Sequence, residues 1–179
     1  MSHEPVGIDS DILIHAYHQT KNDQDDISER ARRLLDWLFD QKRPVYLSVI
    51  SIGEFLVKVP IGKHARTIQK LEERFRIAPF NLKAASLAAD LVSKSKNNPA
   101  IVRVDGDRPC LMADIKIVAS LLATGSVRQI YGNDDRMISI VNSLSTTVAS
   151  KLPVDPLTLL QYQDDPGQSL EPEDFDLDA

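Results

Sequence analysis

The sequence predicts an α/β fold in which a parallel β-sheet is layered with helices. Short apolar, β-branched runs alternate with longer stretches whose apolar residues recur at the helical period. Chains with this alternation form parallel sheets joined by right-handed crossovers. In addition, acidic residues follow two of the strand-like runs, at the sheet edge where open α/β proteins carry their sites. The 179 residues, 42% of them apolar, suit a single packed domain rather than several.

The first elements are a strand and two helices. A strand is expected over residues 5–9, followed by a helix to about His18 and a polar linker over residues 19–25. Asp26, with Glu29 three residues on, is typical of a helix start. The helix that follows has a strongly amphipathic pattern.

A second strand and a pair of helices come next. The strand covers residues 44–47, and Ser48 can cap a helix that contains Ser51 and Glu54 and that Pro60 ends. A helix over residues 61–75 and an extended piece over 76–79 complete this part. Ser48 and Ser51 are interpreted as caps rather than nucleophiles, because no His stands at a recognisable partner position.

The second half begins with two helices separated by a long connection. Asn81 caps a helix that runs to about Lys94. Residues 96–108 then form a connection longer than most, and such loops are often functional. Pro109 suits the first turn of the following helix, which runs to residue 124, and Gly125 suits its C-terminal stop.

The last elements are two strands around a short helix. A strand is expected over residues 127–131, a helix over 135–142 and a final strand over 146–149. We assign residues 1–155 to the folded domain and 156–179 to an acidic C-terminal tail. From residue 164 onward the tail has little to bury, so we expect it to be disordered.

The charge of the chain is unevenly distributed. The net charge is −5, but residues 164–179 contain seven acids and no Lys or Arg. Without these seven acids the chain has 19 acidic and 21 basic residues, so a basic face is feasible on the folded domain. A stretch that could contact RNA, or could simply be a solvated helix surface, contains Lys58, Lys63, His64, Arg66, Lys70, Arg74 and Arg76.

Composition also bears on the compartment. Cys110 is the single cysteine, which excludes a disulfide within the chain and fits a reducing cytoplasm. The N-terminus lacks the pattern of a signal peptide, and no apolar run approaches the ~20 residues of a membrane span. We therefore expect a cytoplasmic protein.

Four acidic residues lie where strands end or helices begin: Asp9, Glu54, Asp114 and Asp134. Brought together without a cation they would repel, by about 4 kcal/mol for two charges ~4 Å apart at an effective dielectric near 20. Oxygen ligands suit Mg²⁺ or Mn²⁺, and the four His residues have no zinc-site spacing. Such an ion activates water against phosphodiesters. Taken singly, each acid could equally be a helix cap or a solvated loop residue.

The pattern of these residues resembles the PIN-domain family, in particular the VapC-type toxin ribonucleases. The resemblance rests on four segments over residues 5–150, and it departs from the family at Gly132, where Ser or Thr is usual. The four segments are Ile8-Asp9-Ser10-Asp11, Leu47-Ser48-Val49-Ile50-Ser51-Ile52-Gly53-Glu54, Asp114-Ile115-Lys116-Ile117-Val118-Ala119 and Gly132-Asn133-Asp134-Asp135.

The resemblance implies a PIN-like three-layer α/β/α fold with a central parallel sheet of four to five strands. It also implies a Mg²⁺- or Mn²⁺-dependent endoribonuclease that leaves 5′-phosphate and 3′-hydroxyl ends. Asp9, Glu54, Asp114 and Asp134 would be the catalytic residues and metal ligands. The supporting residues would be Ser10, Asp11, Asn133 and Asp135. The implied partners are RNA, a cognate antitoxin protein and a second copy of the chain in a homodimer.

Two other readings remain open at this level. The first is a haloacid-dehalogenase-type phosphatase with Asp9 as nucleophile, although Ile12 stands where Thr or Val is expected and Glu54 and Asp114 would have no task. The second is a catalytically silent PIN-like module that binds RNA or protein. We also hypothesise that the acidic tail docks near the basic stretch and weakens RNA binding.

Overall fold

The centre of the structure is a parallel sheet of five strands. The strands are β1 (Val6–Ile8), β2 (Val45–Ser48), β3 (Arg76–Ala78), β4 (Gln129–Tyr131) and β5 (Asp155–Leu157). Their order is β3-β2-β1-β4-β5, and every neighbouring pair is parallel. This computed structural model describes residues 4–18, 26–95, 108–127, 129–134, 137, 139–141 and 155–157.

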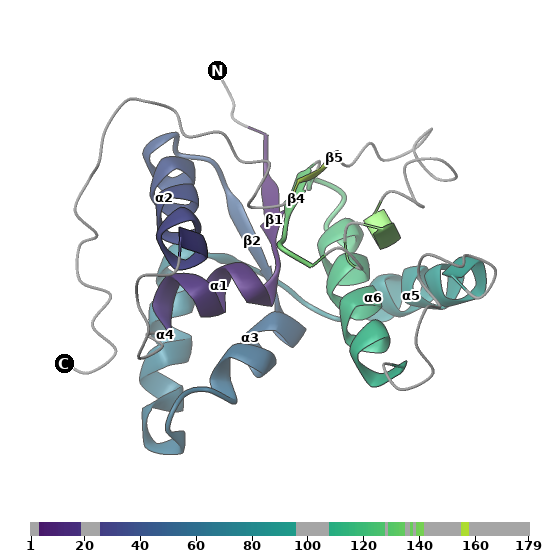
Figure 1. The fold of residues 1–179 in the computed structure, drawn as a ribbon. Coiled ribbons are helices and arrows are strands. Elements are labelled where there is room, and N and C mark those ends of the chain that lie inside the picture. The colour runs from purple at the N-terminus through teal and green to yellow at the C-terminus, as the bar shows by residue number, and fades with distance from the viewer. Residues whose placement is uncertain are drawn as a thin grey trace.

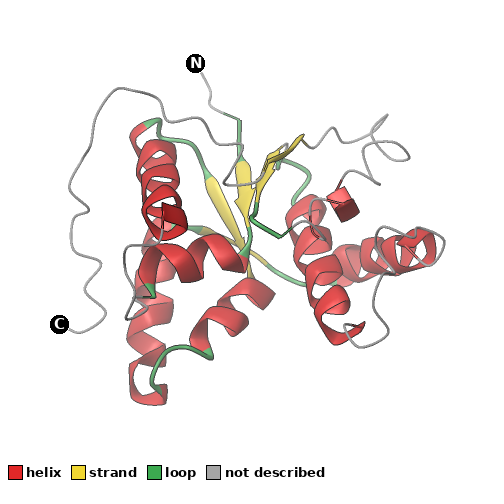
Figure 2. Ribbon diagram, in the orientation of Figure 1, coloured by secondary structure: helices red, strands yellow, loops and turns green. Residues whose placement is uncertain are grey.

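Helices cover both faces of the sheet (Figures 1 and 2). On one side lie α1 (Ser10–Tyr17), α2 (Asp26–Asp40) and α4 (His64–Arg74), and on the other lie α5 (Leu82–Ser95) and α6 (Arg108–Ala123). The short helix α3 (Val49–Leu56) packs against both α1 and α6. The predicted three-layer α/β/α fold with a parallel sheet is therefore confirmed.

Each face of the sheet has its own hydrophobic core, because successive strand residues point to opposite faces. The α1 side buries residues of β1 and β2 against α1, α2, α3 and α4, including Ile8, Leu13, Leu38, Leu47, Phe55 and Leu71. The other side packs β4 against α5 and α6, including Leu91, Val118, Leu121 and Ile130. We call these the α1-side core and the α6-side core.

The expected ends of several helices are confirmed by their caps. The Ser48 hydroxyl accepts a hydrogen bond from Ile50 N at 3.1 Å, and the Asn81 side chain accepts one from Ala84 N at 3.0 Å. Gly125 follows α6 with φ +74°, the left-handed conformation that favours glycine after a helix. Local sequence signals were sufficient at these positions.

The structure corrects two details of the expected elements. The helix expected over residues 61–75 is divided into a 3₁₀ turn, η1 (Ile61–Lys63), and α4, with His64 Nε2 2.9 Å from Val59 O across the turn. The strand expected over 127–131 begins only at Gln129, where pairing with β1 starts.

Several expectations lie outside the described residues. They are the linker over 19–25, most of the connection over 96–108, the strand over 146–149 and the tail beyond residue 157. Strand β5 extends across the boundary expected at residue 155. The division into domain and tail stays a prediction.

Candidate active site

Asp9 is held at the carboxyl end of the central strand. It follows β1, is 3% exposed and caps α1. Its Oδ1 accepts hydrogen bonds from Ser10 N at 2.6 Å and from Ser10 Oγ at 3.2 Å. Its own N–H donates to Tyr131 O at 2.9 Å, which joins the ends of β1 and β4. The carboxylate is therefore held by Ser10, and the backbone of Asp9 is held by the end of β4.

This position is the point where the strand order reverses. From β1 the chain passes through α1 and α2 to β2 on one side, whereas β4 pairs with β1 on the other side. In open α/β sheets the crevice outside the carboxyl ends of the strands at such a point is where ligands bind. The topology alone therefore predicts a ligand-binding site beside Asp9.

Other carboxylates lie close enough to Asp9 to affect its ionisation. Burial raises the pKa of Asp9 well above its usual value, and the negative charge of Asp11 raises it further. The backbone hydrogen bond from Ser10 opposes this effect, and the charges of Asp114 and Glu54 add to it. The fold therefore gathers negative charge around a buried carboxyl group at the edge of the sheet.

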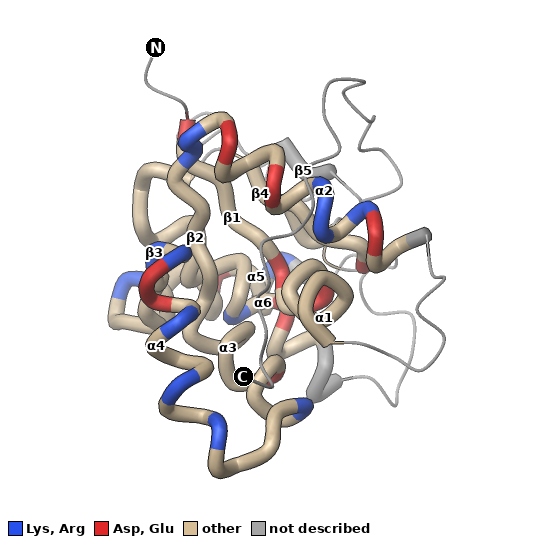
Figure 3. Tube along the Cα trace, turned by 90° about the vertical axis from the view of Figure 1, so that its left-hand side faces the viewer, with Lys and Arg blue, Asp and Glu red and all other residues tan. Residues whose placement is uncertain are grey.

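Glu54 and Asp114 come to this place on two different helices. Glu54 is half-buried on α3, which starts directly after β2, and Asp114 is half-buried on α6. In Figure 3 acidic segments lie together near α1 and α6 in the middle of the view. Asp114 is in the second turn of α6 and not near its start as expected, because the helix begins at Arg108. The helix dipole, which acts within the first turn, therefore does not account for this acid.

Asp134 reaches the same edge of the sheet through the loop after β4. The loop passes so near to Asp9 that a Cβ on Gly132 would stand 3.5 Å from Asp9 Cβ and 3.8 Å from Asp9 Oδ2. Asn133 and Asp134 follow and are half-buried, whereas Asp135 lies outside the described residues. The charges that raise the pKa of Asp9 come from Asp11, Asp114 and Glu54, and the position of the Asp134 carboxylate relative to Asp9 stays a prediction.

The donors around Asp9 are carboxylate oxygens, the type of ligand that a hard dication prefers. Among the described residues, no group of three or more His, Cys, Asp and Glu is arranged closely enough to hold an ion directly. Mg²⁺ commonly retains several waters and takes only one or two protein carboxylates. A partly hydrated ion near Asp9 is compatible with both observations, and the ligand roles of the four acids stay predictions.

Two features of the site were not expected from the sequence. Asp11, expected only as a supporting residue, is the first of the charged groups that raise the pKa of Asp9. The interpretation of Ser51 as a cap is wrong: its hydroxyl is fully buried on α3 and has no hydrogen-bond partner among the described residues. The spacing of Asp9 and Asp11 around a strand end signals the first feature, but no local pattern signals the second.

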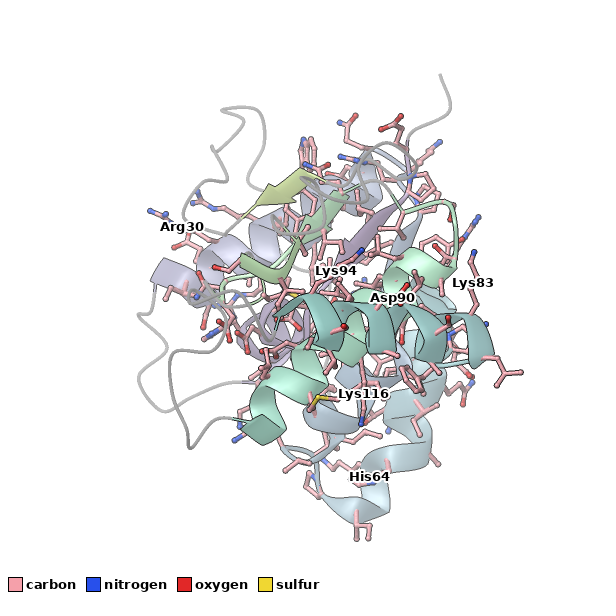
Figure 4. The ribbon with its side chains drawn as sticks, turned by 90° about the vertical axis from the view of Figure 1, so that its right-hand side faces the viewer. Arg30, His64, Lys83, Asp90, Lys94 and Lys116 are labelled. Atoms are coloured by element: carbon pink, nitrogen blue, oxygen red, sulfur yellow. The ribbon has the colours of Figure 1, made fainter. Side chains whose placement is uncertain are left out.

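The basic stretch runs along α4, away from the acidic segments near α1 and α6 (Figure 3). Arg74 of this stretch stabilises the fold, because it donates a hydrogen bond to the Tyr17 hydroxyl at 3.3 Å and its guanidinium lies over the Phe39 ring, 5.5 Å from the ring centre. Its contact with RNA stays a prediction. The α5 side carries both charge signs, with Lys83, Asp90 and Lys94 on it (Figure 4).

Comparison with known proteins gives evidence at the level of the fold. No family model matches the chain, and no curated protein matches its sequence. A solved structure of VapBC2 from Rickettsia felis, bound to a DNA fragment from their promoter, contains a chain that is similar to this one. The two share 13% identity and a TM-score of 0.53, over 85% of this chain and 98% of that one. The similarity supports a PIN-like α/β/α fold. None of the helices among the described residues has the length and apolar character needed to cross a membrane.

Proposed function

We propose that this chain is a Mg²⁺- or Mn²⁺-dependent endoribonuclease of the PIN-domain, VapC-like type. The observation that carries the proposal is the buried carboxyl of Asp9 at the strand-order reversal, with Asp11, Asp114 and Glu54 near enough to raise its pKa. Uncompensated negative charge of this kind is costly in a protein unless a cation balances it. The fold of the VapBC2 neighbour and the sequence resemblance agree with this function.

The four acids of the proposed site supply oxygen ligands from different segments of the fold. Asp9 Oδ1 is occupied by the two hydrogen bonds from Ser10, so Oδ2 is the oxygen left for an ion. Glu54, Asp114 and Asp134 supply further oxygen ligands, directly or through water, from α3, α6 and the loop after β4. When bound, the ion lowers the pKa of a coordinated water and neutralises charge on the phosphodiester. The chain itself orients the carboxylates and limits the access of bulk water to Asp9.

This arrangement favours the nuclease over the phosphatase reading. A phosphatase with Asp9 as nucleophile gives Glu54 and Asp114 no task, whereas both charges act on Asp9 in the structure. A nuclease uses all of them as a shared site for a dication. In a catalytically silent binding module, the repulsion between Asp9 and the neighbouring carboxylates would destabilise the fold without serving a function.

The proposal extends to partners. The VapBC2 structure contains a DNA fragment from the promoter. By the same resemblance, we propose a cognate antitoxin protein as an inhibitor of this chain, RNA as its substrate and a homodimer as its form. Size-exclusion chromatography with light scattering tests the dimer.

The direct test is RNA cleavage by the purified full chain. Total RNA is incubated with Mn²⁺, with EDTA, and with the Asp9→Asn variant, and the new ends are mapped. We expect cleavage that needs the metal and Asp9 and that leaves 5′-phosphate and 3′-hydroxyl ends. Asp90→Asn is the matched control, because Asp90 is exposed on α5 (Figure 4). Cleavage that survives Asp9→Asn, or a complete lack of cleavage by the wild type, counts against the function.

A further inference from the structure

Ser51 is the buried polar group whose task the fold itself does not explain. Its residue is 0% exposed, and its Oγ is the buried side-chain atom without a hydrogen-bond partner in the described part of the chain. Buried hydroxyls are nearly always satisfied, and leaving one unsatisfied destabilises a protein. Alanine would fit a helix better and remove this cost. A serine at this position therefore suggests a partner that the polypeptide does not supply.

The helical period shows the direction of the Ser51 side chain. On α3, Ile52 and Phe55 belong to the α1-side core, and Ile50 packs against the α6-side core. Val49 and Gly53 are exposed. At 100° per residue, the side chain of residue 51 falls between the directions of the two cores, on the inner side of the helix.

Glu54 occupies the same sector of α3, because residues three apart lie on one helix face. Its charge acts on Asp9. Since α3 packs against both α1 and α6, the sector between the two cores lies between the helix that Asp9 caps and the helix that carries Asp114. Ser51 therefore shares its helix face with a residue of the acidic site, deeper in the protein.

We propose that Ser51 is a positioning residue whose hydroxyl hydrogen-bonds a water in the hydration shell of the dication bound at the acidic site. This inference rests on the proposed function, because it needs the metal. A hydroxyl can both donate and accept, which matches a coordinated water that donates to one group and is held by another.

The test measures metal affinity and does not depend on activity. Mn²⁺ is titrated into the full-length wild type, Ser51→Ala and Ser120→Ala by isothermal titration calorimetry, and thermal unfolding of each metal-free protein is recorded. Ser120 is the matched control: it is also 0% exposed on a helix, but its hydroxyl donates to Lys116 O at 2.8 Å.

We expect Ser51→Ala to weaken Mn²⁺ binding by about two- to tenfold, the effect of one hydrogen bond, with no loss of stability in the metal-free protein. Ser120→Ala should leave the affinity unchanged. Unchanged affinity in Ser51→Ala overturns the inference and leaves the proposed function intact. A wild type that does not bind Mn²⁺ overturns both. If Ser51→Ala does not fold, Ser51→Cys keeps the size of the side chain with a weak donor and decides the question in the same way.

Discussion

The Asp9→Asn variant should be more stable than the wild type in the absence of metal. Asp9 is buried among Asp11, Asp114 and Glu54, and these effects raise its pKa. The substitution removes the charge, while the amide oxygen can still accept the hydrogen bond from Ser10 N. Charge at a functional site is commonly kept at a cost in stability.

The size of the effect can be bounded. A single stabilising substitution of this class contributes about 0.5–2 kcal/mol. For a protein of this length, that corresponds to a rise of roughly 1–8 °C in the melting temperature at neutral pH. Saturating Mn²⁺ should reverse the order, because the ion stabilises the wild type by mass action and Asp9→Asn binds it weakly.

The pH dependence gives an independent check. Since the pKa of Asp9 is raised in the folded state, the folded state binds its proton more tightly than the unfolded chain does. The contribution of Asp9 to the stability of the metal-free wild type is therefore largest below its pKa in the unfolded chain, about 3.9, and is lost as the pH rises through the raised folded value. The advantage of Asp9→Asn should shrink as the pH is lowered toward that limit.

Urea unfolding with and without Mn²⁺ at several pH values measures all three effects. The reasoning is refuted if metal-free Asp9→Asn is less stable than the wild type at pH 7. It is also refuted if Mn²⁺ stabilises both proteins equally. Asp90→Asn again serves as control, because Asp90 is exposed and should show neither effect.

Four further predictions concern the site, the packing and the tail. Glu54→Gln should lower Mn²⁺-dependent RNA cleavage by about 10²-fold or more, and a phosphatase would keep its activity on p-nitrophenyl phosphate. Gly53→Ala should stabilise the fold by about 0.5–1 kcal/mol, since nothing lies within 4 Å of the added Cβ on this exposed helix position. Gly7→Ala should destabilise it by about 1–3 kcal/mol, because its Cβ would stand 2.8 Å from Leu121 Cδ1; urea unfolding measures both. A chain ending at Tyr162 should bind and cleave RNA better than the full length if the acidic tail covers the basic stretch, and equal activity would end that hypothesis.

The α/β fold and the positions of most helices follow from the sequence alone. Hydrophobic period and caps are local properties, so Ser48, Asn81 and Gly125 identify helix ends without knowledge of the rest of the chain. Two expected bounds were less accurate. The start of β4 depends on where β1 provides a pairing partner, and the chain after Pro60 divides into a 3₁₀ turn and α4.

The sequence also determined which acids could form a site, because Asp9 ends a strand and Glu54 and Asp114 lie on helices that begin near the same edge. What only the tertiary structure decided is how strongly these groups act on one another. The spacing of Asp9 and Asp11 is visible in the sequence, whereas the burial of Asp9 and the action of Asp114 and Glu54 on it depend on segments far apart in the chain. The same holds for Ser51: its burial depends on how α3 packs against the rest of the fold, including α1 and α6, and that packing is not a local property of any segment.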